Sequence, residues 1–248
     1  MPSIEEFNCM SLKLENLLIL RTYPIAVKML EKDEDIPDGA IRPKQERGFH
    51  LAQCQAFAMN RRSGETIAML KEDNWCWAPL MGFGLVEDPH DAFIDNHSFF
   101  PRFEVGKYIG VVSAPLKTAN FEPDVVLIYS NTAQLLHLVA AVKKHDRELV
   151  HSVFDRTESC VYAIVPVIEN GEYRITIPDP GEYERAMAGD DEMIFSIPAS
   201  KLEGLVEALQ MAEKDGRSYR HQTRIMIPDF PQPSFYKELF EKWGLDID

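Results

Sequence analysis

The stretch VVLIYSNTAQLLHLVAAVKK, residues 125–144, decides the fold class, because it holds a strand and a helix in direct succession. Its first five residues form an unbroken run of β-branched, leucine and aromatic side chains, which predicts a buried strand. From Thr132 to Lys144 the apolar residues recur at helical spacing, which predicts a helix. A second clear strand is predicted over residues 107–114 (KYIGVVSA).

Outward from this stretch, helices and strands follow one another without a regular alternation. Ser3 and Glu6 have the spacing of a capping box, which marks the start of a first helix. The other elements are expected as helices at residues 3–20, 51–62, 201–214 and 235–243 and as strands at residues 24–30, 66–70, 172–177 and 193–197. This mixture predicts an α+β fold, with a mixed β-sheet flanked by helices in a single globular domain over residues 1–215. Residues 216–248 are expected to form a C-terminal extension with an aromatic helix.

The charge and the apolar pattern argue against several classes of protein. The 248 residues include 26 Lys and Arg and 40 Asp and Glu, a formal net charge of −14, which is poorly suited to binding nucleic acid or an anionic membrane. No stretch approaches the roughly 18 apolar residues that a transmembrane helix needs, and acidic residues stand where a signal peptide would carry Lys or Arg. The four cysteines are too few for a disulfide scaffold. We therefore expect a cytoplasmic protein with reduced cysteines and no nucleic-acid or membrane partner.

Three of the four cysteines lie in similar local settings, although they are far apart in the sequence. Cys54 lies early in a predicted helix, and Cys76 and Cys160 each lie near a predicted helix start. A helix N-terminus carries a partial positive charge and free N–H groups, which favour the thiolate that binds iron or zinc. If the three helix ends converge, they form a three-thiolate site. The alternative is that these cysteines pack as small apolar side chains, the role that we expect for Cys9 in the first helix.

Three charged or titratable side chains are candidates for the chemistry of such a site. His50 stands four residues before Cys54, so both can face one way if the helix begins early enough, with His50 as a fourth ligand or a proton carrier. Lys28 lies in an otherwise apolar strand, where a buried ammonium needs a carboxylate partner; the alternative is that it reaches the surface at the sheet edge. Arg156, four residues before Cys160, can steer a substrate carboxylate or a departing anion, or form a structural salt bridge.

Aromatic side chains gather in two neighbouring loops. Trp75 and Trp77 flank Cys76, and further aromatics follow in the segment that contains His97 and Arg102. Such side chains can form the wall of a dry substrate pocket, although core packing is the more common role of aromatic residues. The residues expected to line this pocket are Trp75, Trp77, His97 and Arg102.

Six blocks of the sequence carry a resemblance to a known family. In order, they are CQAFAMNRRSGETI at residues 54–67, WCWAPLMGFGL at 75–85, FPRFEVGKYIGVVSAPL at 100–116, FEPDVVLIYSN at 121–131, RTESC at 156–160 and GDDEMIFSIP at 189–198. They resemble the ArCR family, whose members occur largely in archaea and anaerobic bacteria. The resemblance runs from about residue 15 to residue 215, and PIAVKML at residues 24–30 resembles the first strand of the family.

The resemblance implies that Cys54, Cys76 and Cys160 hold a [4Fe–4S] cluster. The chain departs from the family in one loop, where it has IPDPGEYER at residues 177–185 and many members carry a Gly-Cys-x-Gly-Cys-Arg stretch. It also departs in the two tryptophans beside Cys76, where members have smaller residues. A fourth cysteine ligand is therefore not expected in that loop.

A cluster held by three cysteines leaves one iron open, and an open iron can act as a Lewis acid. We therefore expect an iron–sulfur enzyme for a small hydroxylated substrate, with lyase-type or hydrolytic removal of a leaving group and carbon–halogen cleavage among the candidate reactions. Two alternatives stay open: a non-catalytic sensor or carrier of a metal or small molecule, and a structural zinc site from the same cysteines plus His50. A homodimer is expected only from the general prevalence of dimers among soluble enzymes.

Overall fold

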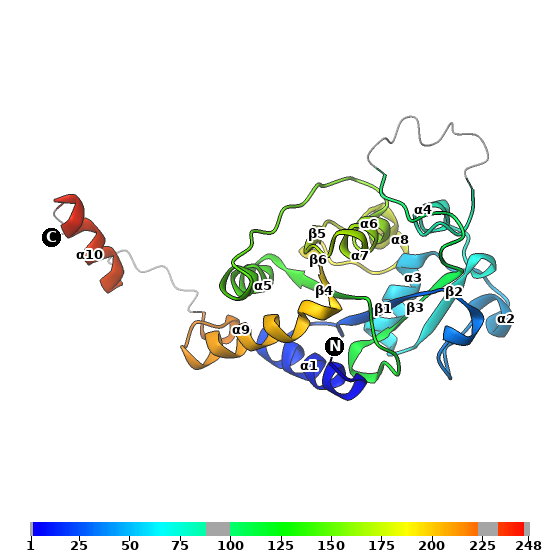
Figure 1. Ribbon diagram of the computed structural model, residues 1–248, viewed down its shortest axis with the longest axis horizontal. Coiled ribbons are helices and arrows are strands. Elements are labelled where there is room, and N and C mark those ends of the chain that lie inside the picture. Colours follow the sequence, from blue (N-terminus) through cyan, green and yellow to red (C-terminus); the bar gives the residue numbers. More distant parts are fainter. Residues whose placement is uncertain (1, 88–99, 223–232, 246–248) are drawn as a thin grey trace.

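The computed structural model describes residues 2–87, 100–222 and 233–245, and Figure 1 shows its ribbon. The helices are α1 (Ile4–Leu18), α2 (Pro43–Arg47), α3 (Gln53–Ala58), α4 (Trp77–Gly82), α5 (Thr132–His145), α6 (Ser159–Tyr162), α7 (Val165–Asn170), α8 (Pro180–Arg185), α9 (Leu202–Lys214) and α10 (Ser234–Trp243). The strands are β1 (Ile25–Leu30), β2 (Ile67–Leu70), β3 (Gly110–Pro115), β4 (Val125–Asn131), β5 (Arg174–Thr176) and β6 (Glu192–Pro198). The α+β class and the single domain expected from the sequence are confirmed.

The six strands form one sheet in the order β2-β3-β1-β4-β6-β5. β1 lies near the middle, where Ile25 pairs with Pro115 of β3 on one side and with Leu127 of β4 on the other. Every pairing between these strands is antiparallel, so the expectation of a mixed sheet is wrong. Parallel pairing within the described ranges is confined to two isolated bridges, Ile41–Ile67 and Leu51–Asn74.

Helices cover both faces of the sheet (Figure 1). We call the face under α1, α5 and α9 the α1 face, and the face under α3, α4, α6 and α7 the α3 face. Side chains alternate along each strand, so Ala26 and Leu30 of β1 pack on the α1 face while Val27 and Met29 pack on the α3 face. Because both faces are covered, six of the seven residues of β4 are buried.

Local sequence signals fix the starts of two long helices. The Oγ of Ser3 accepts a hydrogen bond from the N–H of Glu6 at 3.3 Å, and the Glu6 carboxylate accepts one from the N–H of Ser3 at 2.7 Å. Asn131 and Gln134 make the same reciprocal cap at the start of α5, at 2.9 and 2.8 Å. Each cap stabilises its helix by about 1 kcal/mol. The capping box expected at Ser3 is confirmed.

The helix expected over residues 51–62 begins two residues later, and its helical path continues to Ser63. Leu51 exchanges backbone hydrogen bonds with Asp73 and Trp75, so it extends alongside that segment and cannot join the helix. α3 therefore begins at Gln53, and after Ala58 the chain continues as a single π-helical turn. No helix in the described part of the chain is long and apolar enough to cross a bilayer.

Candidate functional site

The three cysteines of interest each lie at the N-terminal end of a helix, as the sequence predicted. Cys54 is the second residue of α3, Cys160 is the second residue of α6, and Cys76 directly precedes α4 as its N-cap. Cys54 and Cys160 are buried, and Cys76 is half-buried. Cys9 lies exposed on α1, on the other side of the sheet from these three, so the expectation that it packs as a small apolar side chain is wrong.

The three helix ends meet on the α3 face. Cys76 packs against the small apolar cluster that contains Cys54 and also against the core cluster that contains Cys160. α4 contacts α6, and α3 contacts α8, which brings all four helices to one end of this face (Figure 1). Cysteines that lie 22 and 84 residues apart in the sequence therefore share one site.

Burial controls the protonation of these thiols. Loss of hydration raises the pKa of Cys54 to about 12, and it also raises the pKa values of Cys76 and Cys160. For Cys160, the next largest effects after burial are the charges of Asp179, Cys76 and Cys54, which also raise its pKa. The expectation that helix N-termini would favour the thiolates is therefore outweighed by desolvation. Burial therefore favours the neutral thiol at all three cysteines.

Arg185, the last residue of α8, supplies a positive charge to the site. Its guanidinium lies close to Cys54, and its charge lowers the pKa values of Cys54 and Cys76 against the larger effect of burial. The guanidinium also lies over the Trp75 ring, 4.9 Å from the centroid. A Cβ atom at Gly181 would overlap the Nη2 atom of Arg185, so glycine at this position leaves the guanidinium its room.

Asp179 joins the start of α8 to the start of α6. One carboxylate oxygen accepts hydrogen bonds from the backbone N–H and the Oγ of Ser159, both at 3.0 Å, next to Cys160. The other accepts the N–H of Glu182 at 3.0 Å and so caps α8. A single side chain thus fixes Cys160 and Arg185 relative to each other.

Glu182 is a fully buried carboxyl group of α8 next to the cysteines. The hydroxyl of Tyr129 donates a hydrogen bond to Oε1 at 2.9 Å, and Oε2 has no hydrogen-bond partner among the described residues. Burial raises the pKa of Glu182 to about 8. Arg61 lies over the Tyr129 ring, 3.9 Å from the centroid, and pairs with Glu192 at 3.1 Å. The raised pKa favours the protonated form of Glu182 at neutral pH.

Three residues of the site, Asp179, Glu182 and Arg185, were missed from the sequence, because PGEYER has the composition of a surface turn. A signal was present: Asp179 followed by Pro180 is a typical N-cap and first residue of a helix, with Glu182 as the third helical residue. Recognising that helix would have identified α8, though not its neighbours.

The structure does not bring the predicted catalytic residues to the cysteines. Lys28 shares the alternation of Ala26 and Leu30, so it points to the α1 face, away from Cys160. Its charge acts instead on Asp124, a carboxylate that accepts the N–H of Met29. His50 is exposed and precedes α3 in the chain, so it does not share a helical face with Cys54 as predicted. Arg156 is exposed in the loop that leads to α6.

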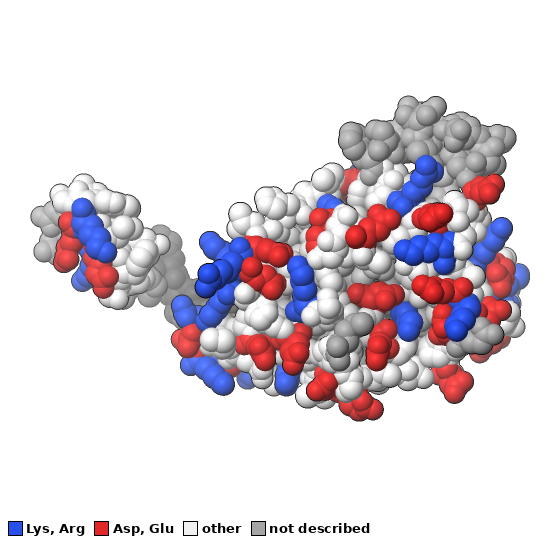
Figure 2. All heavy atoms as spheres, in the orientation of Figure 1, with Lys and Arg blue, Asp and Glu red and all other residues white. Residues whose placement is uncertain are grey.

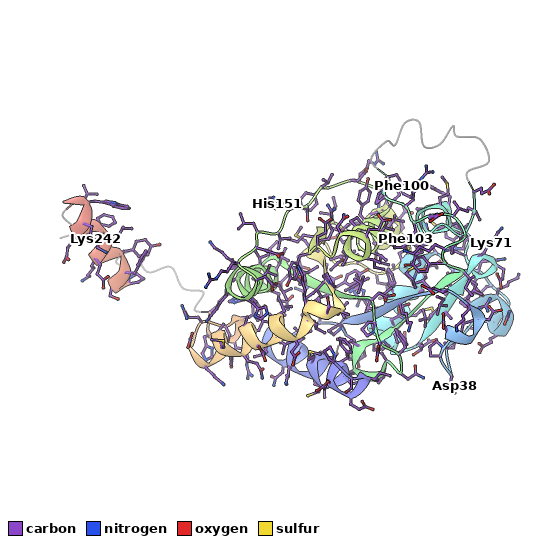
Figure 3. The ribbon with its side chains drawn as sticks, viewed as in Figure 1. Asp38, Lys71, Phe100, Phe103, His151 and Lys242 are labelled. Atoms are coloured by element: carbon purple, nitrogen blue, oxygen red, sulfur yellow. The ribbon has the colours of Figure 1, made fainter. Side chains whose placement is uncertain are left out.

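The expected pocket residues have mixed placements. Trp75 and Trp77 stand beside Cys76 and remain 52% and 38% exposed, so they form an accessible aromatic wall. The Trp77 ring lies 5.7 Å from that of Phe100, and Figure 3 shows Phe100 on the side of the molecule that carries α4 and α6. Arg102 is exposed. His97 lies outside the described residues.

No three His, Cys, Asp or Glu side chains of the described ranges are gathered so that they could hold a single metal ion. A mononuclear zinc site needs four such ligands around one point, and His50 does not complete such a set with the cysteines. A [4Fe–4S] cluster makes a different demand, because each cysteine binds a different iron at a different corner of the cube. Packing places Cys76 beside both Cys54 and Cys160, and the described residues form no site for a single ion.

Comparisons with known proteins agree with the resemblance seen in the sequence. The model of the uncharacterised ArCR family matches residues 13–208. An uncharacterized protein of Methanocaldococcus jannaschii is 22% identical over 217 residues, which cover 80% of this chain and 91% of that protein. No solved structure was found to match. The chain belongs to the ArCR family.

Proposed function

We propose that this protein is an iron–sulfur enzyme in which Cys54, Cys76 and Cys160 hold a [4Fe–4S] cluster beside a site for a small hydroxylated substrate. The observation that carries the proposal is the meeting of three separate helix N-termini, each with one cysteine, on one face of the sheet. Backbone N–H groups at these helix ends are available to hydrogen-bond sulfur, which is a common way to stabilise such clusters.

The charges of the site support a bound cationic group. Two buried thiols and one half-buried thiol are neutral at pH 7 when nothing compensates them, and a coordinating metal removes the thiol protons outright. Arg185 contributes one positive charge next to Cys54. Asp179 joins the starts of α6 and α8, so Cys160 and the neighbouring Arg185 are preorganised by the protein.

The residues around the cysteines support removal of a leaving group. When bound, the cluster supplies an iron without a cysteine ligand, a Lewis acid for a substrate oxygen. Glu182 holds a proton that can be passed to a departing hydroxyl or received from a water. Arg185 can pair with an anionic leaving group such as a halide or carboxylate, and Trp75 beneath it offers an apolar surface to the rest of the substrate. Elimination, hydration and hydrolytic carbon–halogen cleavage all use these parts.

A second candidate is a sensor or carrier that binds the same cluster without turnover. It is favoured by the positions of Lys28 and His50, because neither predicted proton carrier lies at the cysteines. Glu182 is then a structural carboxyl group only.

A substrate panel separates the enzyme from the sensor. Cluster-loaded protein is incubated without oxygen with hydroxy acids, diols and halogenated phenols, and released halide or dehydrated product is measured. We expect turnover by the wild type, at least about tenfold less by Glu182→Gln, and unchanged turnover by Glu207→Gln, whose exposed side chain lies on α9 at the other face of the sheet. An intact cluster with no turnover of any compound favours the sensor.

A further inference from the structure

The C-terminal helix α10 (Ser234–Trp243) presents an apolar face that no other described part of the chain covers. Its large apolar side chains recur at helical spacing and form one stripe: Phe235, Tyr236, Leu239, Phe240 and Trp243. None of its side chains is buried, and Phe235 and Trp243 are 63% and 60% exposed. Figure 1 shows the helix apart from the rest of the molecule. A ten-residue helix is only marginally stable alone in water, so this amphipathic helix needs a partner surface.

A groove that suits such a helix lies between α5 and α9. It has a volume of about 340 Å³ and a floor of small residues that includes Ala140, Ala141, Ala208 and Ala212. Small side chains allow a helix to approach closely, and large aromatic side chains can fill the space above them. The groove is on the outer side of the helices that cover the α1 face, where it is accessible to another molecule.

The groove carries a small excess of positive charge. Lys144 and Arg217 line the groove and share one carboxylate, Asp215, at 3.9 and 2.5 Å. This leaves one excess positive charge at the groove of a chain whose net charge is −14. Figure 2 shows blue Lys and Arg side chains gathered at the end of the body nearest α10. α10 carries two acidic and two basic side chains, Glu238, Glu241, Lys237 and Lys242, on the side away from its apolar stripe, so its docking rests on the apolar contact.

We propose that α10 docks into the α5/α9 groove of a second copy of this chain, so that two copies exchange their C-terminal helices in a symmetric dimer. The groove includes Arg217, close to the point from which the chain leaves α9. The ten residues 223–232 before α10 can span at most about 33 Å, which is enough to reach a neighbouring copy. Exchange of identical elements closes the assembly at two copies.

The buried area agrees with a stable dimer. Each of the four aromatic side chains of α10 can bury about 150 Å², so one docked helix removes roughly 600 Å² of its own surface. Two reciprocal helices remove about 1,200 Å² before the groove surfaces are added, which reaches the size of a specific protein–protein interface. The helix lies beyond residues 13–208, which match the ArCR family, so this assembly is a property of the C-terminal extension and does not depend on the proposed function.

The test is the molar mass of the full-length protein in solution, measured by light scattering after size exclusion. We expect about twice the 28.4 kDa of one chain for the wild type, and one chain mass for Phe240→Asp in the helix and for Ala140→Glu in the groove. Leu12→Glu is the matched control, because Leu12 is an exposed leucine of α1 outside the groove, and it is expected to stay dimeric.

Mixing the two monomeric variants distinguishes exchange from other arrangements. A mixture of Phe240→Asp and Ala140→Glu contains one intact helix and one intact groove per pair, and we expect it to form dimers again at higher concentration than the wild type. A monomeric wild type would overturn the proposal. Protection of α10 from hydrogen exchange in that monomer would mean that the helix docks on its own chain, and sedimentation of the protein with lipid vesicles would mean that it binds a membrane. Dimers that survive both Phe240→Asp and Ala140→Glu would overturn it as well.

Discussion

Replacing Glu182 with glutamine is expected to remove a large part of the pH dependence of stability. Folding raises the pKa of this carboxyl group from 4.5 to about 8, with burial as the main cause. Between these two values the folded protein binds the proton more tightly than the unfolded chain does. The stabilising contribution of the protonated group is therefore complete below about pH 4.5 and is lost as the pH rises through 8.

The difference between 4.5 and 8, at about 1.4 kcal/mol per pKa unit, corresponds to a loss on the order of 5 kcal/mol in the free energy of unfolding. The glutamine side chain of the variant cannot ionise, and its amide oxygen can still accept the Tyr129 hydroxyl. We therefore expect Glu182→Gln to gain stability relative to the wild type as the pH rises, by several kcal/mol between about pH 5 and about pH 9.

Urea unfolding of the reduced, metal-free protein at a series of pH values measures this difference. Glu184→Gln is the control, because it removes one carboxylate from the same helix at an exposed position, and its difference from the wild type is expected to stay small throughout. If the wild-type and Glu182→Gln free energies run parallel over the whole range, the carboxyl group is not held protonated by the fold and the reasoning is refuted.

Three further changes test how α8 supports the cysteines. Arg185→Gln removes the charge that lowers the pKa of Cys54 against burial, so a small thiol reagent should react with Cys54 about two- to tenfold more slowly; equal rates, with Cys9 as internal reference, would contradict this. Gly181→Ala displaces the same guanidinium and should slow Cys54 similarly while changing the free energy of unfolding by less than about 1 kcal/mol; an unchanged rate would show that the guanidinium has room to spare. Asp179→Ala removes a helix cap and two hydrogen bonds to Ser159 and should cost about 1–3 kcal/mol in urea unfolding; a loss below about 0.5 kcal/mol would contradict the joining role.

Most elements of the fold could be predicted because their signals are local. The run at residues 125–129, the helical spacing after Thr132 and the cap at Ser3 each involve a few neighbouring residues. The strand order is different, because it depends on contacts across the chain: β1 pairs with β3 and β4, which follow about eighty and a hundred residues later. No local pattern fixes such pairings, so the antiparallel arrangement could not be deduced.

The candidate site was predictable to a similar extent. Cys54, Cys76 and Cys160 could be placed at helix starts from the sequence, and the structure confirms those positions. The position of His50 was predicted wrongly because the helix was expected to start at residue 51, two residues too early. Leu51 instead pairs with a segment that is distant in the sequence, so α3 starts at Gln53. The alternation of side chains along β1 shows from the sequence that Lys28 shares a face with Ala26 and Leu30. The sequence does not show which face of the sheet carries the cysteines.

The central claim is that Cys54, Cys76 and Cys160 together hold a [4Fe–4S] cluster. The most direct test is iron and sulfide analysis, with a visible spectrum, of protein purified without oxygen. We predict about four irons and four sulfides per chain and a brown colour for the wild type and for Cys9→Ala, and loss of both in Cys54→Ala, Cys76→Ala and Cys160→Ala. A colourless wild type with a single zinc per chain, or a Cys76→Ala variant with an unchanged cluster, would contradict the account.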